Sequence, residues 1–462
     1  MRSITIIYSI LLSSSGLFSQ GYQAGVVIEN LPDGMVYLSQ FRETEYKVID
    51  SIESVNGSFY FYLAEHQPQG MYRMDFQVPA PSQHQDGARF IEFIWADETF
   101  QVFGDYNDLE GTVQFENSEE NRLLQDYSVF AEHYERKMNA IYPMLDRYPE
   151  EDDFYREAAT YFEKIQEERD AFIIDIVQNN PHLYASRIID SYRTITIPYR
   201  LKGKQRIEFL QQHFFDLSPM DDPALMYAPI YTQKIIEYLK LFRNQAYTFS
   251  EQEEAFIRAV DIIMANVSGD IELRKFVVEY LLEGFHSFGM EEAQIYMVDN
   301  YVDETCTTDL VELTTQRVIG YRKMAEGQIA EDILIRGADQ EMIRLSEVDA
   351  DYILVIFWAA YCDHCREIIP DFRKWYLEDK PENLEIFAVS IDSVKSDWTD
   401  YLAMNDLPWI NTHEPMGWEG RSASDYNVYA TPTMFLLDRE RKIIARPFNM
   451  RELRRKIRQM TD

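Results

Sequence analysis

The chain has 462 residues and a formal net charge of −35, with 46% hydrophobic and 14% aromatic residues. That apolar content is enough for globular cores and excludes extensive disorder, and the length predicts two or three domains. The excess of acidic residues excludes nucleic acid as an expected partner, because phosphate binding needs clustered lysine and arginine.

Residues 1–20 are predicted to be an export signal. Arg2 precedes an apolar run from Ile4 to Leu12, and small and polar residues follow as far as Gln20. The run is too short to span a bilayer and is typical of an export signal, with a buried first strand as the alternative. No later segment approaches the roughly 20 apolar residues of a membrane helix. We therefore expect an exported chain whose mature form has no transmembrane segment.

Residues 21–116 are predicted to form a small all-β domain. Short runs rich in aromatic and β-branched residues alternate with turn sequences such as LPDG and VNG. This pattern is typical of a small antiparallel sandwich or barrel. No catalytic constellation is present in this segment.

Residues 117–325 are predicted to be all helical. The first helix is the segment NSEENRLLQDYSVFAEHYERKMNAIYPML, in which apolar residues follow at helical spacing after a capping Asn or Ser. A second long helix precedes Pro181, and others are predicted at 204–216, 223–243, 250–266 and 270–287. Cys306 lies here as an unpaired thiol, with a catalytic or cross-linking role as the alternative. The domain has no assigned function.

Residues 326–462 alternate between strand and helix patterns and predict an α/β domain. The run YILVIFWAAY has the continuous apolar character of a buried central strand, and a helix from Cys365 to about Leu377 follows it. Further strands are predicted in LEIFAVSID, YATPTMFLLD and KIIARPF, with helices near 395–405 and at MRELRRKIRQM.

Cys362 and Cys365 lie at the boundary between the central strand and its helix. The free N–H groups and the dipole at a helix N-terminus stabilise a thiolate, so the pKa of Cys362 is expected to be lowered. Cys365 lies one helical turn further on, where its thiol can resolve a mixed disulfide. A zinc site is an alternative, with His364 between the cysteines, although structural zinc needs four ligands. Another alternative is a degenerate cysteine motif without catalytic function.

The segment FWAAYCDHCREIIPDF resembles the active-site region of the thioredoxin fold, and its surroundings are similar to the exported TlpA/ResA branch. The residues that carry this resemblance are Phe357, Trp358, Ala359, Cys362, Cys365 and Pro370, which kinks the helix. Thr431 and Pro432 match the second family motif, a cis-proline that faces the cysteines and leaves backbone free for a substrate chain. The resemblance covers roughly residues 326–462.

The resemblance implies a thiol–disulfide oxidoreductase in the periplasm or cell envelope of a Gram-negative bacterium. Its cofactor would be the redox-active disulfide Cys362–Cys365 alone. Its partners would be protein thiols and disulfides of the envelope and a membrane thiol–disulfide electron donor. Trp358 would support the active-site loop, and Thr431 with Pro432 would shape the substrate groove. Reductase or isomerase work is expected rather than oxidase work.

Two positions depart from the family pattern, because Ile356 and Ile368 stand where relatives carry buried acids. Glu367 is either a displaced substitute or a surface residue. Between the cysteines, a protonated His364 would stabilise the Cys362 thiolate, whereas Asp363 would oppose it. These opposing effects predict an intermediate reduction potential.

Three further residues are candidates for the mouth of the site. His413 lies in the loop before the Thr431 segment, and Trp409 and Trp418 flank that loop. Ordinary loop and packing roles are the alternatives. Two other functions stay open for the whole chain. One is an envelope binding or scaffold protein in which the redox pair is regulatory. The other is a thiol peroxidase, although the usual Pro-x-x-x-Thr-x-x-Cys loop is absent.

Overall fold

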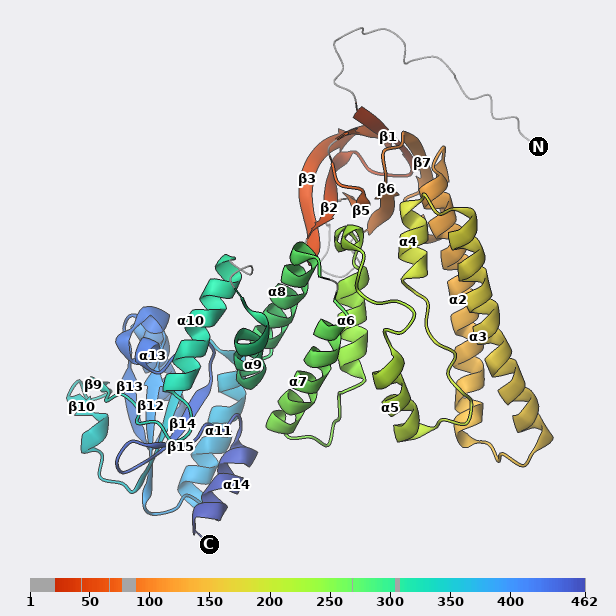
Figure 1. Ribbon diagram of the computed structural model, residues 1–462. Coiled ribbons are helices and arrows are strands. Elements are labelled where there is room, and N and C mark those ends of the chain that lie inside the picture. Colours follow the sequence, from red (N-terminus) through yellow and green to blue (C-terminus); the bar gives the residue numbers. More distant parts are fainter. Residues whose placement is uncertain are drawn as a thin grey trace. The chain divides into compact units, whose positions relative to one another are not determined.

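The computed structural model describes residues 21–42, 44–65, 67–76, 89–267, 269–303 and 308–461. The predicted export signal and Cys306 lie outside these residues. The chain forms two compact units (Figure 1): the first extends to Asn244 and includes Arg258–Tyr280, and the second comprises Gln245–Ile257 and Leu281–Asp462. The helical region is thus shared between the units, and the predicted boundaries at 116 and 325 stay predictions.

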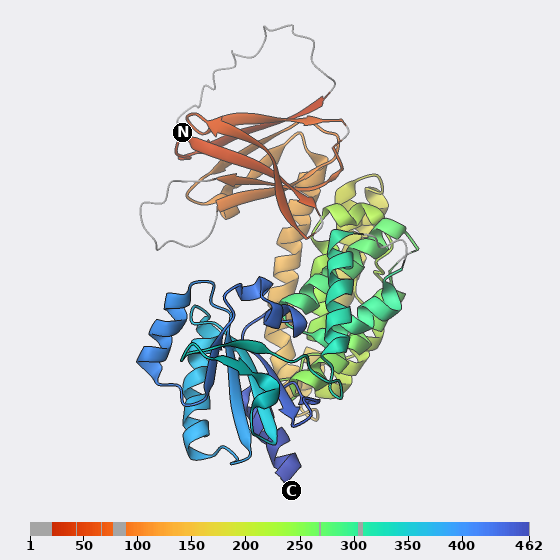
Figure 2. The same ribbon diagram turned by 90° about the vertical axis from the view of Figure 1, so that its left-hand side faces the viewer.

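The first unit begins with a β-sandwich, whose two layers are visible in Figure 2. Its described strands are β1 (Gly21–Glu29), β2 (Gly34–Arg42), β3 (Glu45–Ser54), β4 (Ser58–Ala64), β5 (Gly70–Phe76), β6 (Arg89–Trp95), β7 (Phe100–Asp105) and β8 (Gln114–Glu116). They pair in the orders β4-β1-β7-β8 and β3-β2-β5-β6. The all-antiparallel expectation is corrected at one place, because β1 and β7 are parallel.

Sequence alternation explains the sandwich core. In β4, Phe59, Phe61 and Leu63 are buried while the residues between them are exposed, which is the period-two pattern of a sheet with one buried face. The predicted VNG turn joins β3 to β4, and both Asn56 and Gly57 have positive φ, at 53° and 71°. Such backbone suits a tight hairpin and favours Asn and Gly.

The helices of this unit follow directly from the sandwich. They are α1 (Leu109–Thr112), α2 (Glu119–Arg147), α3 (Asp153–Asn179), α4 (Tyr184–Asp190), α5 (Gly203–His213), η1 (Pro223–Tyr227) and α6 (Ile230–Lys240), with parts of α7 (Phe249–Ala265) and α8 (Ile271–Ser287). Ser118 caps α2, and the buried Asn121 amide exchanges two 2.7 Å hydrogen bonds with the backbone of Ile94. The carboxylate of Glu120 accepts from the first N–H groups of α4. Buried polar contacts therefore fix the first helices to the sandwich.

The second unit contains the ends of α7 and α8, α9 (Glu291–Tyr301), α10 (Asp309–Lys323) and an α/β part. Its strands are β9 (Leu334–Gly337), β10 (Met342–Arg344), β11 (Tyr352–Trp358), β12 (Leu384–Ser390), β13 (Ile410–His413), β14 (Thr433–Asp438) and β15 (Ile443–Ala445). Its other helices are η2 (Leu345–Glu347), α11 (Asp363–Glu378), α12 (Lys395–Asn405), η3 (Gly417–Glu419), α13 (Arg421–Asp425) and α14 (Met450–Thr461). The described strands form one mixed sheet, ordered β10-β9-β13-β12-β11-β14-β15.

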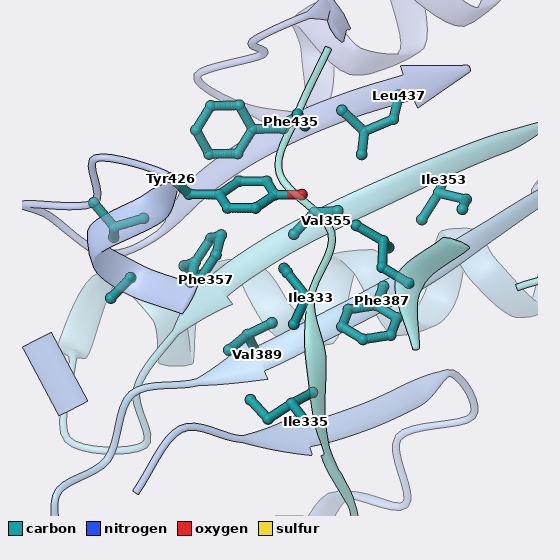
Figure 3. Packing of buried hydrophobic residues seen from close by; sticks show 14 of the residues in the cluster. Ile333, Ile335, Ile353, Val355, Phe357, Phe387, Val389, Tyr426, Phe435 and Leu437 are labelled. Carbon is teal, nitrogen blue, oxygen red and sulfur yellow. The ribbon is translucent and has the colours of Figure 1, made fainter. Parts of the chain in front are cut away.

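The central strand β11 is buried on both faces, as its apolar run predicts. It is parallel to β12 and antiparallel to β14. Val355 and Phe357 enter one core, whereas Ile356 and Trp358 enter the core under α11 and α14. In the first core, Figure 3 shows the ring of Tyr426 between Phe357 and Phe435, with centroids 5.2 Å and 5.3 Å away.

The predicted fold class is confirmed: an N-terminal all-β part, a helical middle and a C-terminal α/β part. Within the described residues, the helices are too short or too polar to cross a membrane.

Candidate active site

The two cysteines lie where β11 ends and α11 begins. Cys362 is the N-cap of α11, and its Sγ accepts a hydrogen bond from the N–H of Cys365 at 3.3 Å. Cys362 is half-buried, whereas Cys365 has no exposed surface and packs with Ile369, Phe372 and other residues under the sheet. Both are present as free thiols. The nucleophile position is therefore accessible while the second thiol is enclosed.

The surroundings of Cys362 favour its thiolate. Burial by itself would raise the pKa of this thiol, but hydrogen bonds outweigh burial. They come from the side chains of Cys365 and Thr431 and from the backbone N–H groups of Cys365 and His364. The pKa of Cys362 consequently lies below the ordinary value of a free thiol. Orphan N–H groups at a helix N-terminus supply this stabilisation.

Cys365 has the opposite character. Burial, followed by the hydrogen bond and the negative charge of Cys362, raises the pKa of the Cys365 thiol to about 12. The pair thus consists of an activated thiol and a protonated, enclosed one. This asymmetry matches the division of labour between an attacking and a resolving cysteine.

Thr431 and Pro432 lie opposite the cysteines, as expected. The peptide bond between them is cis, and the Sγ of Cys362 lies 3.3 Å from the carbonyl oxygen of Thr431. The structure therefore brings together residues that are 69 positions apart in the chain. Pro432 precedes β14, which pairs with β11, so the pairing of these strands brings the Thr431 segment to the end of β11 that leads to Cys362.

The remaining predicted site residues divide into supporting and exposed groups. Trp358 is buried, packs with its ring centroid 5.0 Å from that of Tyr401, and is in the core next to Cys365. Pro370 lies inside α11 on its exposed side. The side chains of Asp363 and His364 are also exposed, so solvent screens their charges. The backbone N–H of His364 forms a hydrogen bond that contributes to the lowered pKa of Cys362.

The two positions that depart from the family pattern are filled by apolar packing. Ile356 is buried and Ile368 packs against the same core. Glu367 is exposed on α11, so the idea that it replaces a buried acid is wrong. Among the described residues, no three His, Cys, Asp or Glu side chains are placed to hold a metal ion.

One residue that sequence reasoning missed holds the active-site loop. Asp392 follows β12, has no exposed surface, and accepts the N–H of Ala360 at 2.9 Å and 3.0 Å with its two oxygens. The hydroxyl of Ser390 also donates to it, at 2.7 Å. On the other side, Arg366 donates to the carbonyl of Ala360 at 2.6 Å. The peptide groups on both sides of Ala360 are therefore held, next to the turn that leads into Cys362.

The three candidates for the mouth of the site, His413, Trp409 and Trp418, differ in their exposure. His413 is buried, stacks on Trp398 and lies 2.7 Å from the carbonyl oxygen of Asp392. It therefore contacts the residue that holds the active-site loop and does not line the mouth of the site. Trp409 is buried in the core. Trp418 is 40% exposed and donates a 3.1 Å hydrogen bond to Tyr361, the neighbour of Cys362. Of these three residues, only Trp418 has the exposure expected of a rim residue.

The pKa difference predicts a site-specific pH profile of alkylation. Because only the thiolate reacts, alkylation of Cys362 should speed up with pH, reach half its maximum at a lower pH than a free cysteine peptide, and then level off. Cys365 should stay unmodified in the folded chain throughout. Mass spectrometry after timed alkylation measures both. If Cys362 reacted no faster than Cys306 at neutral pH, the assignment of Cys362 as nucleophile would fail.

Residues 327–446 match the family described as AhpC/TSA, and residues 25–124 match a domain of unknown function, DUF4369. A thiol-disulfide oxidoreductase ResA from Oceanobacillus iheyensis is 27% identical over 110 residues, which are 24% of this chain and 53% of that protein. The chain thus spans about half the length of that relative. The sequence resemblance to ResA proteins is confirmed.

Solved structures are similar to parts of this chain. The thioredoxin domain of a thiol-disulfide oxidoreductase from Bacteroides vulgatus is 25% identical and covers 30% of this chain and 99% of its own, with a TM-score of 0.28. A thioredoxin-like protein from Bacteroides caccae is 19% identical and covers 59% of this chain and 98% of its own, with a TM-score of 0.42. The chain carries a C-terminal thioredoxin-fold domain of the AhpC/TSA family, with ResA thiol-disulfide oxidoreductases among its relatives, and an N-terminal DUF4369 domain.

Proposed function

We propose that the chain is an exported thiol–disulfide oxidoreductase that exchanges disulfides with proteins of the cell envelope. The observation that supports this most directly is the asymmetric pair: Cys362 with a lowered pKa at a helix N-terminus, and Cys365 enclosed beside it. The redox-active disulfide Cys362–Cys365 would be the only cofactor. Thr431, beside Cys362, would offer backbone to an extended substrate chain.

The reaction proceeds in two exchange steps. The Cys362 thiolate attacks one sulfur of a substrate disulfide, forms a mixed disulfide and releases the other substrate sulfur as a thiolate. Cys365 then loses its proton and attacks the Sγ of Cys362. A Cys362–Cys365 disulfide forms and the second substrate sulfur leaves. Two electrons pass from the pair to the substrate. A membrane thiol donor would return two electrons and one proton, which restore the Cys362 thiolate and the Cys365 thiol.

The resolving step needs Cys365 to lose its proton, and the structure supports a route without a buried acid. The charge and hydrogen bond of Cys362 both raise the pKa of Cys365. Forming the mixed disulfide neutralises Cys362, which removes these two contributions and lowers the pKa of Cys365 at the moment when its thiolate is required. The thiolate released from the substrate in the first step can accept the proton of Cys365. Ile356 and Ile368 then need no replacement by an acid.

The direction of exchange and the competing functions are tested together. The reduced full-length chain is mixed with a disulfide-bonded peptide, the oxidised chain with a dithiol peptide, and the reduced chain with hydrogen peroxide. Reductase or isomerase function predicts that the first reaction is the fastest. A faster second reaction would overturn the direction, and a faster third would favour a thiol peroxidase. If none of the three reactions occurred, the result would favour a scaffold protein in which the redox pair is regulatory.

A further inference from the structure

Helix α10 contacts the loop that leads to Thr431. The side-chain amide of Asn427 donates a hydrogen bond to the carbonyl oxygen of Arg317, at 3.2 Å, across 110 positions of sequence. Asn427 has a positive φ of 52°, which Asn adopts more readily than most residues. This helix lies outside residues 327–446, which match the thioredoxin-fold family. Figure 1 shows it next to the sheet of the second unit.

Two further contacts join the same elements. At Gly320, one helical turn after Arg317, an added Cβ would lie 1.9 Å from Oδ1 of Asn427, so only glycine allows the amide to approach the helix this closely. The guanidinium carbon of Arg317 lies 5.3 Å from the ring centroid of Tyr429. Such a cation–π contact is worth about 0.5–1 kcal/mol at an exposed site. The loop is therefore held at two residues.

The position of this loop decides where Thr431 lies. Tyr426, immediately before Asn427, is buried, and its hydroxyl donates to the carbonyl of Glu331 at 2.8 Å. On the other side, Thr433 begins β14. Between these fixed points, Asn427 and Tyr429 come four and two residues before Thr431, whose carbonyl oxygen is 3.3 Å from the Sγ of Cys362.

The helix is itself firmly attached within the second unit. Tyr321 of α10 is 5% exposed, and Arg322 forms an ion pair with Asp299 of α9. Helix α9 is joined to the α/β part by the carboxylate of Glu291, which binds the guanidinium of Arg446 with both oxygens. Because α10 is attached to α9, and α9 to the α/β part, α10 can restrain the loop at Asn427 and Tyr429.

We infer that α10 is a positioning element of the redox site, and that its contacts with Asn427 and Tyr429 hold Thr431 against Cys362. The inference rests on the proposed thiol–disulfide function and adds a role for a helix outside the thioredoxin-fold match. The residues of α10 act through the loop, and their effect should appear in the reactivity of Cys362.

Gly320→Ala in the full-length chain tests this inference, and Gly284→Ala is its matched control. Both glycines lie in helices of the second unit, so helix propensity favours alanine equally at the two positions. Nothing lies within 4 Å of a Cβ added at Gly284, whereas one at Gly320 meets Asn427. Only the first substitution should therefore displace the loop.

Two quantities are measured for each variant: the pH midpoint of Cys362 alkylation, and the rate constant for its reaction with a disulfide-bonded peptide. For Gly320→Ala we expect the midpoint to rise and the rate constant to fall by about tenfold, since misplacement by 1 Å can cost up to ~100-fold. Gly284→Ala should match the parent chain. Asn427→Gly, which keeps the left-handed backbone and removes the amide, should act like Gly320→Ala.

The outcomes separate this inference from the proposed function. If the parent chain reacts with the peptide but Gly320→Ala and Asn427→Gly both keep its midpoint and rate, α10 has no positioning role. If the parent chain itself does not react, the proposed function fails. If Gly320→Ala does not fold, Asn427→Gly alone decides.

Discussion

Replacing Cys362 by serine should lower the rate of disulfide exchange by on the order of 10⁴-fold or more, as expected when a covalent nucleophile is removed. A serine hydroxyl is far less acidic than this thiol, whose pKa is lowered by Thr431 and by N–H groups of α11, and it is not ionised at neutral pH. The fold should be unaffected, since Cys362 is half-buried and serine accepts the same hydrogen bond from Cys365. Turnover of a disulfide-bonded peptide with an excess of dithiol measures the effect.

Cys306→Ser is the matched control for that experiment. It also removes one thiol, but one that has no part in the proposed reaction, so turnover should equal that of the parent chain. Equal losses in the Cys306 and Cys362 variants, or an unchanged rate in the latter, would contradict the assignment of the nucleophile.

Replacing Asp392 by alanine should both destabilise the chain and weaken Cys362 as a nucleophile. The N–H of Ala360 and the hydroxyl of Ser390 would lose their acceptor. We expect a stability loss of about 2–6 kcal/mol, because each of the two buried donors left without a partner costs roughly 1–3 kcal/mol. A looser turn would align Cys362 less well with the N–H groups of α11, so the pKa of Cys362 should rise toward its ordinary value. Thermal or denaturant unfolding and the alkylation midpoint measure the two effects.

Asp392→Asn separates the geometry of the loop from the charge of the carboxylate. Asparagine keeps one oxygen for the N–H of Ala360, and its amide can donate to the hydroxyl of Ser390, but the negative charge is gone. Removing a negative charge on its own would lower the pKa of Cys362. Positioning therefore predicts a raised midpoint in the alanine variant and a midpoint near or below that of the parent in the asparagine variant. A lowered midpoint in both variants would show that the charge dominates.

Much of the fold and the two cysteines could be predicted from local patterns. The run that forms β11 is apolar on both faces, and the helix that begins at Asp363 buries residues at helical spacing, including Cys365 and Phe372. Such periodicities depend on nearby residues only. Strand β13 was not predicted, because its four residues, INTH, are too few and too polar to show the alternation of a strand or the periodicity of a helix.

The supports of the site could not be predicted because they are contacts between distant segments. Asp392 is one of many acidic residues, and only the fold brings it to Ala360, 32 positions away. The contact of Asn427 with α10 spans more than a hundred positions, and no pattern in either segment indicates the other. The backbone N–H of His364 also stabilises the Cys362 thiolate, which depends on where the helix begins, while the predicted effect of the imidazole stays a prediction. Sequence patterns identify helices and strands, but contacts between residues far apart in the chain can be identified only from the folded structure.

The central claim is that Cys362 attacks a substrate disulfide and Cys365 resolves the adduct. It is tested most directly by mixing the reduced Cys365→Ala variant with a disulfide-bonded peptide, then mapping adducts by mass spectrometry without reductant. The variant cannot resolve, so we predict a stable mixed disulfide at Cys362 that does not accumulate in the parent chain. An adduct at Cys306 alone, or no adduct in a folded variant, would contradict the claim.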